Sequence, residues 1–171
     1  MLNNRGGVNL DYYKGFIIEA DKFNLFKPTL LKLLTATDIE LITRSMLDKE
    51  CGIDAIAKID SQHFLIGLRF RKTLIDYNSI TLSRHFNDPN SEIKKFLYNK
   101  IRPDFFIQIT EINNSLRITE INIDSFNFYL KYLIKHNLLE SYYNTNLKAY
   151  EFQLGNFKTG EHGIRNILIN N

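Results

Sequence analysis

The pattern of hydrophobic and polar positions predicts that helices and strands follow one another along this chain. Residues Tyr12–Ala20 are rich in aromatic and β-branched side chains, which favours a strand. From Thr29 to Met46 the apolar residues recur near helical spacing, and Pro28 suits a first helical turn. A capping Thr or Asp at positions 37–38 divides this region into two helices, the second ending near Asp48.

Two short alternating stretches in the middle of the chain predict a β-hairpin. The first covers Ile53–Ile59 and the second covers His63–Lys72, with a tight turn between them. The shortness of this turn makes the two strands antiparallel. We therefore expect a mixed sheet built on this hairpin, with a helix over Asp38–Asp48 packed on one of its faces.

The second half of the chain continues the same mixture of elements. The expected elements are a helix from Asp88-Pro89 to about Lys100, strands over Phe105–Ile109 and Ser115–Ile123, a helix over Phe126–His136 capped by Asp124 or Ser125, and a mixed tail over Tyr150–Asn171 with turns at Gly155, Gly160 and Gly163. The last helix carries more aromatic rings than the single face that packs against the core would need. It is therefore either a core element or a protein interface. In this order, the elements predict an α/β (α+β) fold with a mixed central β-sheet flanked by helices, in a single domain covering residues 1–171.

Composition indicates an ordinary folded domain and narrows the functional classes little. The chain has 171 residues, of which 44% are hydrophobic and 24% charged, and this composition excludes a disordered polymer. Its formal net charge of +3 is compatible with nucleic acid but common among soluble proteins. The polar start of the chain carries no signal-peptide core, and no apolar run reaches the ~18 residues of a membrane span. We therefore expect a cytoplasmic protein with no membrane partner.

The most specific pattern lies in Asp48–Lys72, which reads DKECGIDAIAKIDSQHFLIGLRFRK. A Gly-Ile-Asp triplet ending at Asp54 enters the first strand of the hairpin, and the second strand follows a tight turn. This arrangement resembles the PD-(D/E)XK nuclease superfamily. The resemblance implies a restriction-endonuclease-like core over about residues 29–123, with a C-terminal helical and tail extension. It also implies that Asp54 is a catalytic metal ligand and that Glu40 is the glutamate of the preceding helix.

The chemistry that the resemblance implies is metal-assisted phosphodiester hydrolysis, with Mg²⁺ or Mn²⁺ held by Asp54 and Glu40. The implied partner is nucleic acid, DNA rather than RNA. The family places an acid and a lysine two positions apart on the second strand, but here these positions hold Gly67 and Arg69. Arg69 can hold a phosphate, but it cannot act as a base because its guanidinium stays protonated. Candidates for a further metal-binding carboxylate are Asp38, Asp60 and Asp76.

Each candidate residue also has a purely structural explanation. Asp54 can cap backbone groups at the end of a turn, and Glu40 can be a solvated residue on a helix. Arg69 and Arg71 can be the charges that protect an edge strand from pairing with another chain. The sequence alone leaves both explanations open.

Positive charge is concentrated between Arg69 and Arg102, where eight basic residues stand against three acidic ones. Such a segment can follow a phosphate backbone, or it can form a solvated helix face around Lys94–Lys100. The residues expected to hold flanking phosphates are Arg71, Lys72, Arg84, Lys94 and Lys95.

Two functional hypotheses follow from these observations. The first is a nuclease-like protein that binds nucleic acid and hydrolyses phosphodiester bonds with a divalent metal. The second is a catalytically inactive nuclease-fold module that needs no cofactor and acts as a subunit or an inhibitor, as a homodimer or with a protein partner. The retained Gly-Ile-Asp triplet favours the first hypothesis, whereas Gly67 and Arg69 favour the second.

Overall fold

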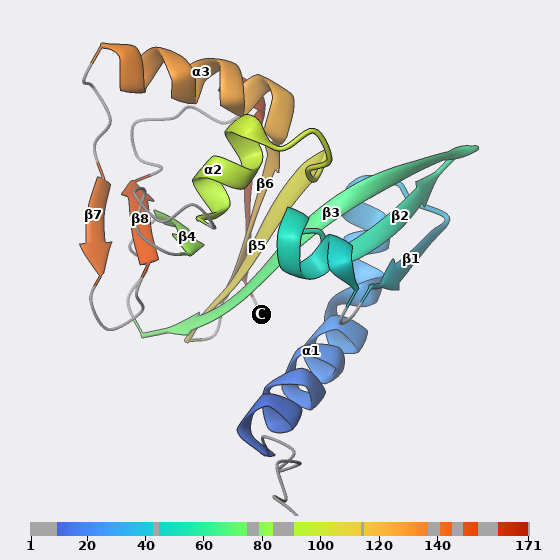
Figure 1. Cartoon of the computed structure of the whole chain (residues 1–171). Helices are drawn as coiled ribbons and strands as arrows, with labels where there is room; N and C mark the ends of the chain where they lie inside the picture. Colours follow the sequence, from blue (N-terminus) through green and yellow to red (C-terminus); the bar gives the residue numbers. More distant parts are fainter. Residues whose placement is uncertain are drawn as a thin grey trace, which may run out of the picture.

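A six-stranded mixed sheet forms the centre of the molecule, with helices against it and a three-stranded sheet to one side (Figure 1). In this computed structural model the described residues are 10–42, 45–74, 79–83, 91–113, 115–136, 141–144, 149–153 and 161–170. Their elements are α1 (Leu10–Leu34), β1 (Asp38–Leu41), the short π-helical turn η1 (Leu47–Cys51), β2 (Ala55–Ile59), β3 (Gln62–Thr73), β4 (Ser79–Ser83), α2 (Glu92–Tyr98), β5 (Phe105–Ile112), β6 (Ser115–Asn122), α3 (Ile123–Lys135), β7 (Ser141–Asn144), β8 (Ala149–Gln153), the 3₁₀ turn η3 (Glu161–Gly163) and β9 (Ile164–Asn170).

The strands of the large sheet lie in the order β1-β2-β3-β5-β6-β9, and the small sheet has the order β4-β8-β7. The pairs β1-β2, β2-β3, β5-β6 and β6-β9 are antiparallel. Strands β3 and β5 are parallel, with Arg69 opposite Gln108. A parallel pair requires the chain to cross over between the two strands, and α2 lies within this crossover.

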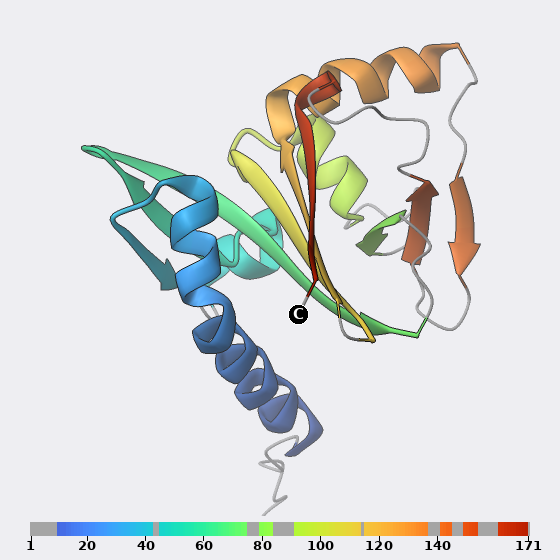
Figure 2. The same ribbon diagram turned by 180° about the vertical axis from the view of Figure 1, so that it is seen from behind.

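One face of the large sheet is apolar and packs against α1 (Figure 2). The rings of Phe26 on α1 and Phe70 on β3 stack there with centroids 5.8 Å apart. Burial of each large side chain stabilises the fold by roughly 1.5–3 kcal/mol. The buried members of this cluster are Phe23, Phe26, Leu30, Leu34, Ile39, Ala55, Ala57, Ile66, Ile107, Ile109 and Ile118.

The opposite face of the sheet contacts α2, α3 and β4 and is mixed in character. Its apolar part surrounds Phe96 and Phe106, whose rings lie 5.5 Å apart. Its middle is polar: Gln108, Thr110, Arg117 and Thr119 are all buried. Because side chains alternate along a strand, these residues share a face with Arg69 and Arg71. The sheet therefore has an apolar side towards α1 and a polar interior towards β4.

The hairpin prediction is confirmed. Strands β2 and β3 pair antiparallel from Ala55 opposite Ile66 to Ile59 opposite Gln62. The strands expected over Phe105–Ile109 and Ser115–Ile123 are present as β5 and β6. The mixed α/β class, with a mixed sheet flanked by helices, is therefore the fold of this chain.

The strand predicted over Tyr12–Ala20 is wrong, because these residues belong to α1, which begins at Leu10. Aromatic and β-branched content is only a weak preference for a strand. Pro28 lies inside the same helix rather than in its first turn. The helix continues through this residue although a proline removes one backbone hydrogen bond.

The helix predicted over Asp38–Asp48 is also wrong. Helix α1 ends at Leu34, Thr35 adopts a positive φ of 53°, and Asp38–Leu41 forms strand β1 against β2. The reason is visible in burial, since Ile39 is fully buried between two exposed neighbours. A strand of four residues is too short for its period of two to be distinguished from a helical pattern.

The later boundaries differ from the expected ones in their caps. Helix α2 begins at Glu92 and is capped by Ser91, whose hydroxyl accepts the Lys94 N–H, while residues 88–89 lie outside the described part of the chain. Helix α3 is capped by Asn122 rather than by Asp124 or Ser125. In the tail, Gly163 has a φ of +74° and precedes β9. Gly155 and Gly160 lie outside the described residues.

Candidate functional site

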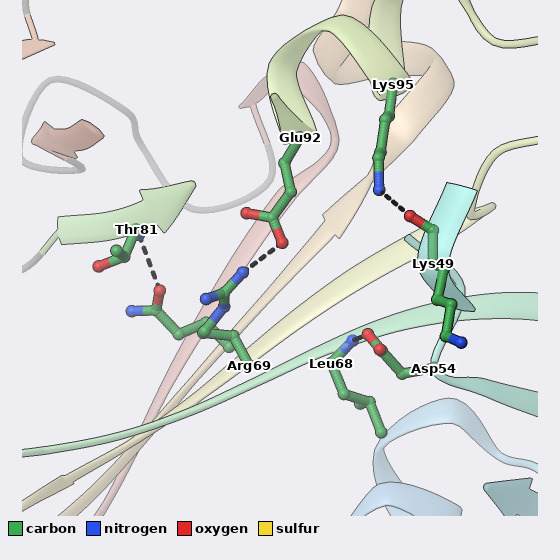
Figure 3. A network of polar contacts seen from close by, with 8 residues as sticks. Lys49, Asp54, Leu68, Arg69, Thr81, Glu92 and Lys95 are labelled. Carbon is green, nitrogen blue, oxygen red and sulfur yellow. Dashed lines mark hydrogen bonds and ion pairs between the residues drawn. The ribbon is translucent and has the colours of Figure 1, made fainter. Parts of the chain in front are cut away.

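The candidate site lies where the start of β2, the middle of β3, the turn η1 and the first turn of α2 come together (Figure 3). Asp54 stands one residue before β2 and continues the pairing with β3 through its main chain and its side chain. Its N–H donates to the Ile66 carbonyl at 2.8 Å, and its Oδ2 accepts the Leu68 N–H at 2.6 Å. Asp54 therefore binds the backbone of β3 at the point where β2 begins.

The Asp54 carboxyl is in an unfavourable place for a negative charge. Burial, together with the charges of Asp48 and Glu92, raises its pKa to about 7 against the opposing effects of the Leu68 N–H and Arg69. A half-buried carboxylate whose pKa is raised by two other carboxylates is an arrangement that a cation would stabilise. Perturbed carboxyl groups of this kind are concentrated at functional sites, although structural networks also produce them.

Arg69 projects from β3 and forms an ion pair with Glu92 at the beginning of α2. Both side chains are largely removed from solvent, with 29% of Arg69 and 14% of Glu92 exposed, so the pair is more than a surface contact. The Arg69 Nε is buried and has no hydrogen-bond partner among the residues that the structure describes. Asp54, Arg69 and Glu92 thus form one group of charges, which we call the Asp54 cluster.

Gly67 occupies the strand position where the resemblance led us to expect an acid, and any side chain there would be crowded. A Cβ at this position would lie 3.0 Å from the Gly52 carbonyl oxygen, 3.1 Å from Phe106 and 3.3 Å from Pro103. The Gly52 main chain has a φ of +70° and ends the turn η1 directly above β3. The close approach of these two segments favours a glycine on the strand.

Glu40 does not lie where the sequence placed it. It stands on strand β1 rather than on a helix, its partner in the pairing is Ile56, and its side chain is exposed. Of the further acids, Asp38 forms an ion pair with Lys27 at 3.2 Å. Asp60 is in the turn at the far end of the hairpin, and residue 76 lies outside the described chain.

The residues expected to hold flanking phosphates are not gathered in one place. Arg71 contacts the Thr81 hydroxyl on the polar face of the sheet. Lys72 is on the opposite face, where it lies 3.7 Å from Glu111. Lys95 extends from α2 and donates to the Lys49 carbonyl at 2.6 Å. Lys94 is one residue earlier on α2, and Arg84 is outside the described residues.

Sequence reasoning missed three polar residues on this face of the sheet: Glu92, Gln108 and Arg117. Gln108 accepts the Thr81 N–H and donates to the Ser79 carbonyl, both at 2.8 Å, which fixes β4 above the sheet. Arg117 also donates to the Ser79 carbonyl, at 3.3 Å. Burial, with the nearby charge of Arg71, lowers the pKa of Arg117 to about 10.

The chain is thus a mixed α/β protein with a half-buried group of charges on one face of its central sheet. No model of a protein family matches the chain, and no curated protein or solved structure matches it significantly. Among the described residues, no three His, Cys, Asp or Glu side chains are arranged to hold a metal ion. Within the same residues, no helix is both long enough and apolar enough to cross a membrane.

Proposed function

We propose that this chain is a nuclease-like protein that binds nucleic-acid phosphate at the Asp54 cluster and hydrolyses phosphodiester bonds with a divalent cation. The observation that carries the proposal is the desolvated Asp54 carboxyl, with a pKa near 7, beside a second carboxylate and an arginine. A bound cation would compensate for the repulsion between the Asp54 carboxylate and its neighbouring carboxylates, and perturbed carboxyl groups of this kind are concentrated at functional sites.

The arrangement of elements supports the same proposal. A helix is followed by three antiparallel strands, and a crossover helix then leads to a strand parallel to the third. This order agrees with a restriction-endonuclease-like core, in which the Gly-Ile-Asp triplet enters the second strand. The fold by itself does not determine function, so the proposal depends on the chemistry of the cluster.

The donor atoms of the cluster suit Mg²⁺ or Mn²⁺, because these ions bind oxygen ligands and are commonly held by one or two carboxylates. Asp54 and Glu92 would supply those carboxylates, with Glu92 in the role that the sequence assigned to Glu40. A bound cation polarises a phosphate and lowers the pKa of a coordinated water molecule. Arg69 would bind an oxygen of the same phosphate and stabilise its charge, but it would accept no proton.

A second candidate function is an inactive nuclease-fold module that binds nucleic acid or protein without a cofactor. One observation that favours it is the crowding at Gly67. Strand β3 therefore has no carboxylate at the position where the resemblance led us to expect one. The ion pair between Arg69 and Glu92 is the second such observation, because each group already satisfies the charge of the other. The two candidates differ in whether the cluster binds a cation and cleaves.

One experiment distinguishes the two candidates. Binding of Mg²⁺ and Mn²⁺ is measured by calorimetry, and cleavage of labelled DNA and RNA is followed with the same ions. We expect Asp54→Asn and Glu92→Gln to abolish both cation binding and cleavage. Asp124→Asn is the matched control, since it removes a carboxylate that is 80% exposed and paired with Arg102 outside the cluster. Absence of both cation binding and cleavage in the wild type would support the inactive module.

A further inference from the structure

A groove of about 560 Å³ lies beside the Asp54 cluster, between the turn η1 and the end of α2. Its volume is within the ~300–1,000 Å³ that is usual for ligand sites. The lining residues that matter here are Lys49, Glu50, Tyr98, Asn99, Lys100 and Ile101. They come from two segments about 50 positions apart in the sequence, so the groove exists only in the folded chain.

The two walls of this groove are joined by hydrogen bonds. The Lys95 ammonium group donates to the Lys49 carbonyl at 2.6 Å, as Figure 3 shows. The Asn99 side chain donates to the Glu50 carbonyl at 3.0 Å. At the end of the turn, the Gly52 N–H donates to the Asp48 carbonyl at 3.1 Å. The groove is therefore formed before any ligand arrives, which lowers the entropic cost of binding.

The groove presents both an aromatic ring and positive charge to solvent. Tyr98 is 67% exposed and Ile101 is 52% exposed, so neither side chain contributes mainly to the core. Lys49 and Lys100 are also exposed, and within the described part of the chain neither ammonium group has an ion-pair partner. Glu50 adds one negative charge, so the cationic character is concentrated at the two lysines.

An exposed tyrosine between lysines has the chemistry of a platform for an unpaired nucleotide. A base stacks on the ring whatever its identity, while ammonium groups neutralise the phosphates on either side. The bases of a duplex are stacked on one another and cannot lie against such a ring without being extruded. The features of the groove therefore favour single-stranded nucleic acid over a duplex.

The groove and the Asp54 cluster share two chain segments, η1 with the residues after it and α2. Cys51 lines the groove and is three residues before Asp54, and Lys95 is one helical turn after Glu92. We propose that this groove binds single-stranded nucleic acid, with a base on Tyr98 and phosphates at Lys49 and Lys100, an inference that rests on the proposed function and specifies its substrate.

The test is fluorescence anisotropy with a labelled single-stranded oligothymidine and a duplex of equal length, in EDTA so that no cleavage occurs. We expect the wild type to bind the single strand more tightly than the duplex. Tyr98→Ala should weaken binding of the single strand roughly tenfold or more, whereas Tyr98→Phe, which keeps the ring, should bind as the wild type does. Lys100→Gln should lower the slope of log affinity against log salt by about 0.7, and Glu50→Gln should tighten binding.

Tyr132→Ala is the matched control, because Tyr132 is a half-exposed tyrosine on α3 and outside the groove. Equal binding by wild type and Tyr98→Ala, or tighter binding of the duplex, would overturn the inference. If Tyr98→Ala loses single-strand binding but the wild type cleaves nothing with Mg²⁺ or Mn²⁺, the groove is supported and only the proposed hydrolysis fails. If the wild type cleaves but Tyr98→Ala changes neither binding nor cleavage, the groove fails and the hydrolysis stands.

Discussion

Replacing Asp54 by Asn tests whether the buried carboxyl destabilises the folded protein. The amide keeps an oxygen that can accept the Leu68 N–H and removes the ionisable group. The folded state raises the pKa of Asp54 from 3.8 to about 7, so the folded protein binds this proton more tightly than the unfolded chain does. The resulting contribution to the free energy of unfolding is fully present below about pH 4 and is lost as the pH rises through about 7.

The size of the effect follows from the same values. Each tenfold change in proton affinity corresponds to about 1.4 kcal/mol, so the difference between 3.8 and about 7 sets an upper limit of about 4 kcal/mol. We expect about half of this, roughly 2 kcal/mol, because the residue keeps some contact with solvent. The variant should therefore be more stable than the wild type at pH 8, and the difference should shrink towards pH 4.

The assay is urea unfolding followed by far-UV circular dichroism between pH 4 and pH 8, in EDTA. Asp104→Asn is a suitable comparison, because Asp104 also accepts a β3 N–H, that of Leu65 at 2.7 Å, but in an exposed position. Added Mg²⁺ should stabilise the wild type above pH 7 and leave the Asp54 variant unchanged, since an ion that binds only the folded state raises its stability. An Asp54→Asn protein that is less stable than wild type at pH 8, or a difference that does not vary with pH, would refute the reasoning.

The remaining predictions concern the arginine, the glycine and the binding of nucleic acid. Arg69→Ala should lower kcat/KM for a labelled oligonucleotide less than Asp54→Ala does, and equal losses in the two variants would contradict this. Arg69→Lys keeps a cation beside Glu92 and should retain or raise activity. Gly67→Ala should lower the free energy of unfolding by about 1–3 kcal/mol, because its Cβ would lie 3.0 Å from the Gly52 carbonyl oxygen; an unchanged urea midpoint would show that the turn moves away freely. The logarithm of the wild type's affinity for DNA should fall linearly with the logarithm of salt concentration, by a slope of about 0.7–0.9 for each phosphate neutralised, and an affinity that is insensitive to salt would rule out phosphate contacts.

The sequence was a good guide to the hairpin and a poor one to the elements before it. Strands β2 and β3 were predictable because both alternate over several residues and a short turn fixes their pairing. Strand β1 has only four residues, so its burial pattern becomes visible only when β2 lies beside it. The first half of α1 was misread because its aromatic and β-branched residues also suit a strand.

The candidate site was predictable only where its residues are close in sequence. Asp54 and Arg69 belong to the same hairpin, and strand alternation places both on one face. Glu92 is 23 positions beyond Arg69, and nothing local indicates that the two side chains meet. Glu92 could have been placed had the parallel pairing of β3 with β5 been known. The helix that connects two parallel strands packs over the sheet, which brings the first turn of α2 towards β3.

The crowding at Gly67 and the position of Glu92 have a common explanation in the turn η1. This turn brings the Gly52 carbonyl oxygen close to β3, which crowds any side chain at Gly67. The polar face of the sheet still contains Arg69, whose half-buried charge is stabilised by a partner. The first turn of α2 supplies that partner from the other side, so the negative charge near Asp54 comes from a helix instead of the strand. A cluster built in this way keeps two carboxylates and one cation, and whether a metal ion can draw Glu92 away from Arg69 determines whether it acts as a catalytic site or as a structural one.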